Sequence, residues 1–162
     1  MRLLEGSCHC GAARFAVRSH TPHPYMHCYC SICRKTAGGG GYAINIMGQA
    51  ETLTVTGEAA LVVYQAHGTG DDSGRPSPAR RHHCGTCGSV LYISDPRWPE
   101  WVYPFASAVD TALPMPPERV HIMLDFKAPW VRVPEGPGEV LFAAYPDESI
   151  ADWHRRHGLY VL

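Results

Sequence analysis

Apolar and polar side chains alternate along several short stretches of the chain. Between residues 13 and 18, Ala13, Phe15 and Val17 fall on one side, while Arg14 and Arg18 fall on the other. This period of two is typical of a half-buried β-strand. The pattern predicts further strands in residues 42–46, 53–55, 61–63, 90–93, 101–105 and 121–124. Turns are expected at Gly48-Gln49 and Gly57-Glu58, so the earlier strands are predicted to form a β-meander.

Other stretches lack this alternation. Residues 67–80 are rich in Gly, Pro, Ser and Asp and show no apolar period, which predicts a mobile loop. Residues 114–117 and 134–138 contain clustered prolines and are expected to be irregular connections.

One helix is predicted close to the C-terminus. Pro146-Asp147 is expected to open it, Ile150 and Trp153 share one face, and Gly158 is expected to end it. No repeat and no domain boundary is visible. The sequence therefore predicts one domain spanning residues 1–162, mainly β, with a short C-terminal helix.

Composition narrows the choice of partners. The net charge is −1 and acidic and basic residues are interspersed, which argues against nucleic acid as a partner. No apolar run reaches the 18 residues of a transmembrane helix, and the first residues lack the apolar stretch of a signal peptide, so we expect a cytoplasmic protein with no membrane partner. Seven cysteines in a reducing compartment favour metal binding over disulfides. The pattern does not indicate an oligomeric state.

The seven cysteines fall into three clusters, and these carry the chemistry. They are Cys8-x-Cys10, Cys28-x-Cys30-x-x-Cys33 and Cys84-x-x-Cys87. Zinc prefers four tetrahedral ligands and binds thiolates well. Two pairs from distant segments make one closed four-cysteine site of Cys8, Cys10, Cys84 and Cys87. The trio of Cys28, Cys30 and Cys33 then forms a second site with an open position, and two zinc ions are expected.

An open position suits catalysis, since structural zinc sites are closed. Coordination deprotonates a thiol, so we expect a small thiol as the fourth ligand of the trio. Two alternatives remain at this stage. A histidine, with His27, His82 and His83 as candidates, could close the trio and make it structural. A redox Cys-x-x-Cys is less favoured, because no βαβ pattern surrounds either pair.

The three clusters resemble the glutathione-dependent formaldehyde-activating (GFA) family, whose domain also occurs in centromere protein V. The shared motifs are Cys8-His9-Cys10-Gly11, Cys28-Tyr29-Cys30-Ser31-Ile32-Cys33-Arg34 and Cys84-Gly85-Thr86-Cys87-Gly88, and the likeness extends to Lys127-Ala128-Pro129-Trp130 and the C-terminal segment. The chain departs from the family pattern at Tyr29, where His is usual, at His83, where Phe is common, and in the longer stretch at residues 67–80.

The resemblance implies a fold and an activity. The fold would be a β-tent of short antiparallel sheets pinned by zinc. The outer two cysteine pairs would hold a structural zinc and the trio a catalytic one. The enzyme would join glutathione, or a similar small thiol, to formaldehyde or a related aldehyde, and it would count as a carbon–sulfur lyase.

Several residues outside the clusters are weaker candidates. Arg34 and Lys35 could hold a substrate carboxylate, or they could lie in a solvated turn. Residues 38–41 could form an anion-binding nest or a flexible connection. Trp98, Trp101 and Trp130 could line a pocket or belong to the core, and His121 and His154 could act as acid or base or be packed histidines. At the level of the whole protein, a non-catalytic zinc scaffold or protein-interaction module is the main alternative to an enzyme, and a zinc buffer is a third.

Overall fold

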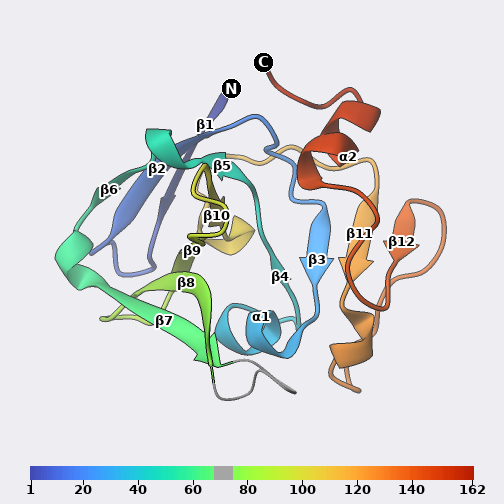
Figure 1. The fold of residues 1–162 in the computed structure, drawn as a ribbon, viewed down its shortest axis with the longest axis horizontal. Coiled ribbons are helices and arrows are strands. Elements are labelled where there is room, and N and C mark those ends of the chain that lie inside the picture. The colour runs from blue at the N-terminus through green and yellow to red at the C-terminus, as the bar shows by residue number, and fades with distance from the viewer. Residues whose placement is uncertain (68–74) are drawn as a thin grey trace.

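The computed structural model describes residues 1–67 and 75–162, and it contains three β-sheets. The first sheet is antiparallel, with the strand order β1-β2-β6 (Figure 1). Its strands are β1 (Arg2–Ser7), β2 (Arg14–Ser19) and β6 (Thr54–Thr56). In β2, Phe15 and Val17 are buried while Arg14 and Arg18 are exposed, so the predicted alternation is confirmed.

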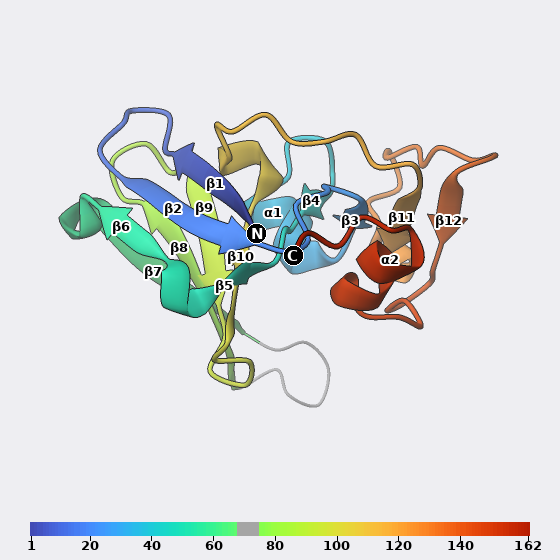
Figure 2. The same ribbon diagram turned by 90° about the horizontal axis from the view of Figure 1, so that it is seen from above.

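The second sheet is antiparallel and has five strands in the order β5-β10-β9-β8-β7. Its strands are β5 (Gly48–Gln49), β7 (Leu61–His67), β8 (Pro76–Cys84), β9 (Val90–Ser94) and β10 (Trp101–Pro104). The first sheet packs against one of its faces (Figure 2). Phe15 and Tyr92 meet edge to face there, with ring centroids 5.9 Å apart, and Leu4, Leu91 and Val102 complete that core.

The third sheet is mixed, with the order β12-β11-β3-β4. Its strands are β3 (Met26–Cys28), β4 (Ala43–Ile44), β11 (Arg119–Ile122) and β12 (Glu139–Leu141). Strand β11 pairs in parallel with both β3 and β12, because long connections bring these strands back in the same direction. Figure 1 places this sheet on the opposite side of the molecule from β7 and β8.

Helix α2 (Ile150–Arg156) covers the third sheet. Trp153 is fully buried there and stacks on Tyr25, with centroids 3.8 Å apart. Ser149 caps the helix by accepting a hydrogen bond from the Asp152 N–H at 3.1 Å, so the helix begins at Ile150 and not at Pro146. The predicted apolar face is confirmed, since Ile150 packs against the same core.

A second helix, α1 (Ser31–Thr36), was not predicted. It is short, and its β-branched Ile32 and Thr36 weaken any helical signal. The Cys30 side chain caps it by accepting a hydrogen bond from the Cys33 N–H at 3.3 Å. The helix therefore begins inside the second cysteine cluster and determines where its sulfurs lie.

Some predicted connections are strands instead. Gly48-Gln49 was expected to be a turn, yet it forms β5 and pairs with β10. The predicted loop at residues 67–80 is wrong for His67, which ends β7, and for residues 76–80, which belong to β8. Residues 68–74 lie outside the described residues. Strands β1, β3 and β12 were not predicted. The turn at Gly57 is confirmed, and its φ of 75° is the left-handed conformation that glycine adopts readily.

Within the described residues, no helix has both the length and the apolar character that crossing a bilayer requires.

Candidate metal centres

Four cysteines from two hairpin turns come together between the first and second sheets. Cys8 and Cys10 lie in the β1–β2 turn, Cys84 ends β8, and Cys87 lies in the turn before β9. All four Sγ atoms are within 4.8 Å of one another. The Sγ of Cys10 lies 3.6 Å from that of Cys8 and 3.7 Å from that of Cys84. We call these four residues the closed set.

The spacing of the closed set fits a tetrahedral zinc ion. Two thiolates that are each about 2.3 Å from one zinc stand about 3.8 Å apart. The Ala13 N–H also donates to the Cys8 Sγ at 3.3 Å, which favours the ionised sulfur. Because one pair comes from the first sheet and the other from the second, a metal here would join the two sheets.

The trio lies where the third sheet meets α1. Cys28 ends β3, Cys30 is the N-cap of α1, and Cys33 is buried on the inner face of that helix. Their Sγ atoms lie within 4.8 Å of one another. Across residues 1–67 and 75–162, no histidine or carboxylate joins this group. The trio therefore has the ligand number of an open site.

The proximity of the three sulfurs perturbs their ionisation. Hydrogen bonds from the thiols of Cys28 and Cys33 lower the pKa of Cys30 to about 2. The same contact with Cys30 raises the pKa of Cys28 to about 12, and the contacts with Cys28 and Cys30 raise that of Cys33. One negative charge is thus favoured and the next two are opposed. A cation among the sulfurs would remove this repulsion, so the trio also fits a metal.

The histidines that could have closed the trio face elsewhere. The Nδ1 of His27 lies 3.2 Å from the Tyr25 carbonyl oxygen, and its ring packs against Tyr42. His82 stacks on Tyr92, and its Nε2 lies 3.0 Å from the Ser94 hydroxyl. His83 lies on β8, and its ring stacks against Tyr64. The alternative in which a histidine completes the trio is not supported.

Tyr29 anchors the segment that carries the trio. Its side chain is buried, and its hydroxyl lies 2.9 Å from the Nδ1 of His121. The Nε2 of His121 lies 2.8 Å from a carboxylate oxygen of Glu139, which also pairs with Arg119. The Tyr29 N–H donates to the Ile122 carbonyl at 3.0 Å. The residue that departs from the family pattern therefore ties the loop between Cys28 and Cys30 to β11 and β12.

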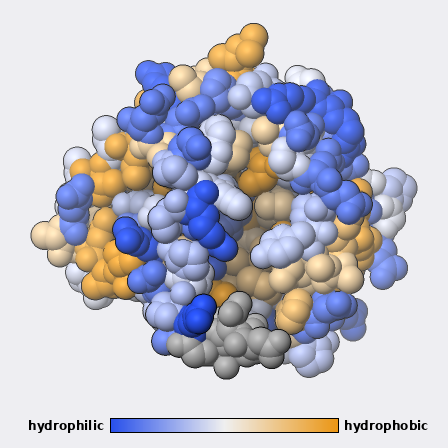
Figure 3. All heavy atoms as spheres, viewed as in Figure 1, coloured by the Kyte–Doolittle hydropathy of each residue, from blue (hydrophilic) through white to orange (hydrophobic). Residues whose placement is uncertain are grey.

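A cleft of about 490 Å³ opens on the trio at Cys30. The first turn of α1 forms one wall, and the start of β8 forms another. Its remaining walls come from segments that are distant in sequence and include Arg97, Met123, Phe126 and Tyr145. Figure 3 shows that this face of the molecule is hollowed between the half that carries β7 and β8 and the half that carries β3, β11 and β12. The cysteine spacing gave no signal for these wall residues.

Comparison with known proteins identifies the family. The sequence model of the family described as "Glutathione-dependent formaldehyde-activating enzyme" matches residues 3–124, which include all seven cysteines. The chain belongs to this family. A Halomonas elongata protein named for glutathione-dependent formaldehyde activation is 59% identical over 157 residues, covering 97% of this chain and 98% of that protein. The crystal structure of a Rhodobacter sphaeroides protein, 26% identical, matches with a TM-score of 0.50 over 68% of this chain and 91% of that one.

Other candidate residues in this member of the glutathione-dependent formaldehyde-activating family lie away from the trio cleft. Arg34 and Lys35 line a separate hollow with Gly38 and Gly39, and no cysteine borders it. Trp98 and Trp101 line another hollow, and Trp130 is exposed on the surface. His121 and His154 are buried and hydrogen-bonded, as expected of packed histidines.

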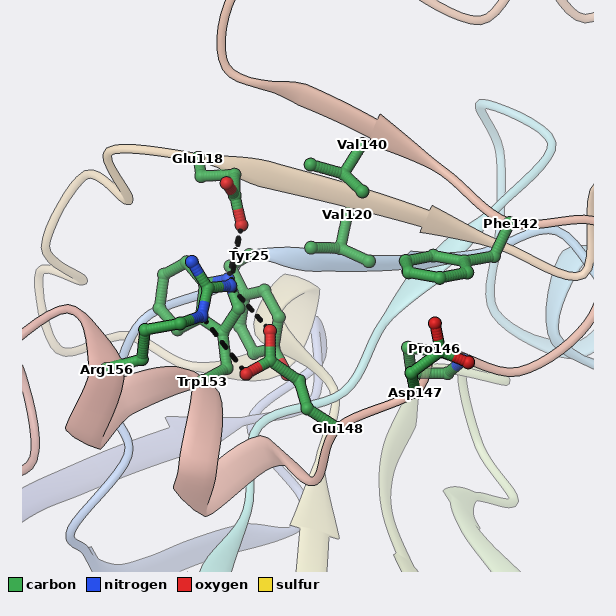
Figure 4. Close-up of a pocket in the computed structure, with 10 residues that line it drawn as sticks. All are labelled: Tyr25, Glu118, Val120, Val140, Phe142, Pro146, Asp147, Glu148, Trp153 and Arg156. Atoms are coloured by element: carbon green, nitrogen blue, oxygen red, sulfur yellow. Dashed lines mark hydrogen bonds and ion pairs between the residues drawn. The ribbon is translucent and has the colours of Figure 1, made fainter.

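A smaller hollow of about 230 Å³ lies between α2 and the third sheet (Figure 4). Val120, Val140 and Phe142 form its apolar side, and Arg156 crosses it to reach Glu118 and Glu148. These ion pairs connect the helix to the sheet and to the segment before the helix. The hollow has no cysteine in its walls, so it is separate from both metal centres.

Proposed function

We propose that the chain is a zinc-dependent enzyme that adds a small thiol such as glutathione to formaldehyde, or to a related small aldehyde, and catalyses the reverse. The observation that carries this proposal is the trio of sulfurs, which lacks a further ligand among the described residues and opens into a cleft at Cys30. The closed set supplies four thiolate ligands of its own and would be structural. Two zinc ions per chain are therefore proposed, one structural and one catalytic.

The proposed reaction is a simple addition. The sulfur of the thiolate forms a bond with the carbonyl carbon, and the π electrons of the C=O bond move to its oxygen, which takes up a proton. The product is a hemithioacetal, and breaking its C–S bond in the reverse direction makes the enzyme a carbon–sulfur lyase. Zinc held by Cys28, Cys30 and Cys33 would favour the thiolate form of the substrate and orient it.

The chain itself contributes position and exclusion of water. Cys30 is fixed as the N-cap of α1, and Cys28 is fixed by the pairing of β3 with β11. The cleft walls enclose a substrate beside these sulfurs, which brings the two reactants into a near-attack geometry. We treat residues 1–162 as one domain. The closed set joins the first sheet to the second, and the trio joins α1 to strand β3 of the third sheet.

The test is the exchange rate between ¹³C-formaldehyde and glutathione, followed by exchange NMR on protein with verified zinc content. We expect the native protein to speed the exchange above the spontaneous rate and Cys30→Ser to abolish that increase. Arg132→Gln serves as a control, because Arg132 is exposed and borders neither cysteine group. An exchange rate equal to the spontaneous rate with native, zinc-loaded protein would favour a non-catalytic scaffold.

A further inference from the structure

We propose that Arg97 selects thiols that carry a carboxylate group, by binding that carboxylate in the cleft beside Cys30. This inference rests on the proposed function, since it assigns a second anchor for the same substrate. Arg97 would recognise the part of the thiol that is remote from its sulfur.

The charges of the cleft walls favour an anionic ligand. Arg75 and Arg97 both line the cleft, and His67 lies with them. No aspartate or glutamate lines it within the part of the chain that the structure describes. Met123 and Phe126 add apolar surface to the same cleft. A concave site with apolar walls and a few charged groups is typical of small-molecule binding, and apart from the sulfur of Cys30 the charged groups here are cationic.

Arg97 is held in a fixed orientation by Asp95. Its Nε lies 3.0 Å and 3.2 Å from the two carboxylate oxygens of Asp95, and its Nη2 lies 2.6 Å from one of them. The Arg97 N–H also donates to Asp95 at 3.0 Å. The Asp95 side chain is 10% exposed, whereas that of Arg97 is 59% exposed. The aspartate is therefore the buried support, and the guanidinium is the group presented outward.

This arrangement leaves one edge of the guanidinium for a ligand. The Nε and Nη2 groups contact Asp95, whereas Nη1 has no hydrogen-bond partner within the described residues. A guanidinium can bind two carboxylates through different edges of its planar fork. Asp95 offsets part of the positive charge, and Arg75 adds a second positive charge to the same cleft.

Arg97 and the trio border the same space. Arg97, Tyr145 and Cys30 all line this one cleft. A thiol of tripeptide size could place its sulfur at the trio and a carboxylate at Arg97 within a cleft of about 490 Å³.

The backbone at Met123, another part of the cleft wall, has an uncommon conformation. Within residues 1–67 and 75–162, Met123 is the only non-glycine residue with a positive φ, at 61°. Its N–H donates to the Ala144 carbonyl at 2.8 Å, which fixes the chain directly before Tyr145. Such conformations often occur at ligand sites, where surrounding contacts maintain them. This part of the cleft wall is thus held in place before any ligand binds.

The test compares two thiols on zinc-loaded protein. Glutathione carries two carboxylates, and its diethyl ester keeps the thiol but removes both. We expect the native protein to have a KM and a calorimetric Kd about tenfold lower for glutathione than for the ester, the size expected for one charge-assisted hydrogen bond. Arg97→Gln should remove that preference by raising the KM and Kd for glutathione toward those for the ester. Arg97→Lys should restore part of it, and the control Arg132→Gln should keep all of it.

The outcomes separate the two proposals. Equal KM and Kd values for glutathione and its ester with native protein would overturn the assignment of Arg97 and leave the proposed function standing. A preference for glutathione that survives Arg97→Gln would also overturn it. Failure of both thiols to bind and react would overturn both proposals together.

Discussion

Replacing Cys84 with serine should unfold the protein, whereas replacing Cys30 with serine should not. Cys84 is buried, ends β8 and packs in the core between the first and second sheets. A structural zinc contributes on the order of 10 kcal/mol to folding. A domain of this kind has a net stability of about 5–15 kcal/mol. Losing this metal would therefore remove most or all of the free energy of unfolding.

The same substitution at Cys30 has a different context. Cys30 is half-buried at the N-cap of α1, where its side chain accepts a hydrogen bond from the Cys33 N–H. Serine is a favoured N-cap and can accept that bond, so the helix start is preserved. A loss of about 1–3 kcal/mol would lower the melting temperature by about 2–12 °C in a chain of this size.

Circular dichroism melts and zinc content would measure both variants. Cys84→Ser should show no cooperative transition at 25 °C or above, and Cys30→Ser should show one close to that of the native protein with at least one zinc retained. Equal melting curves for the two variants would refute the division between a structural set and a catalytic trio.

Three further predictions concern the pH dependence of stability, the anchor of the trio and the release of metal. Burial lowers the pKa of His154 to about 4 from 6.5, and the neutral ring fits its contacts, with Nδ1 2.8 Å from the Ile150 carbonyl oxygen and Nε2 accepting from the His23 N–H at 3.3 Å. As the pH falls, the unfolded chain therefore binds a proton at this histidine before the folded chain does. The free energy of unfolding, measured by urea titration, should fall by up to about 3 kcal/mol between pH 6.5 and pH 4. His154→Gln should make the free energy of unfolding less dependent on pH over this range. Tyr29→Phe removes the hydroxyl that contacts His121 and should lower the free energy of unfolding by about 1–3 kcal/mol in the same titrations. The control Tyr64→Phe, at an exposed position on β7, should lower it by less than about 0.5 kcal/mol. Equal losses for the two variants would contradict the anchoring role of Tyr29. Mild chelation should remove one zinc together with activity and leave the other in place; release of both ions at the same rate would instead indicate a zinc buffer.

The sequence predicted the elements whose signals are local. The alternation around Phe15 and Val17 gave β2, and the shared face of Ile150 and Trp153 gave α2. The cysteine spacing predicted that sulfurs within each cluster lie close together, because short Cys-x-x-Cys and Cys-x-Cys segments keep them close whatever the surrounding fold. The structure also places the sulfurs of Cys8 and Cys10 beside those of Cys84 and Cys87, as the grouping into two sets predicted.

The elements that were missed depend on tertiary contacts. Strand β1 was not predicted because two apolar residues, Leu3 and Leu4, are adjacent and interrupt the alternation of apolar and polar positions. In the structure Leu4 is buried and Leu3 is exposed. Strand β8 contains Pro76 and Pro78, which normally argue against a strand. They are tolerated because β9 pairs with β8 only from Arg80 onward, so this end of β8 lies at an edge.

The cleft could not be predicted for a similar reason. Arg34 and Lys35 seemed close to the trio because they follow Cys33 in sequence, yet α1 directs them into another hollow. Arg97 and Tyr145, which do line the cleft, are far from the trio in sequence. Only the pairing of distant strands brings them beside Cys30.

The most direct test of the central claim is zinc X-ray absorption of the fully loaded protein, before and after glutathione is added. With one zinc in the closed set and one in the trio, the average number of sulfur ligands should begin near 3.5, with the balance from lighter atoms, and should rise toward 4 when the thiol is present. A sulfur number that stays unchanged at saturating glutathione would contradict the account of the trio as an open site for a thiol.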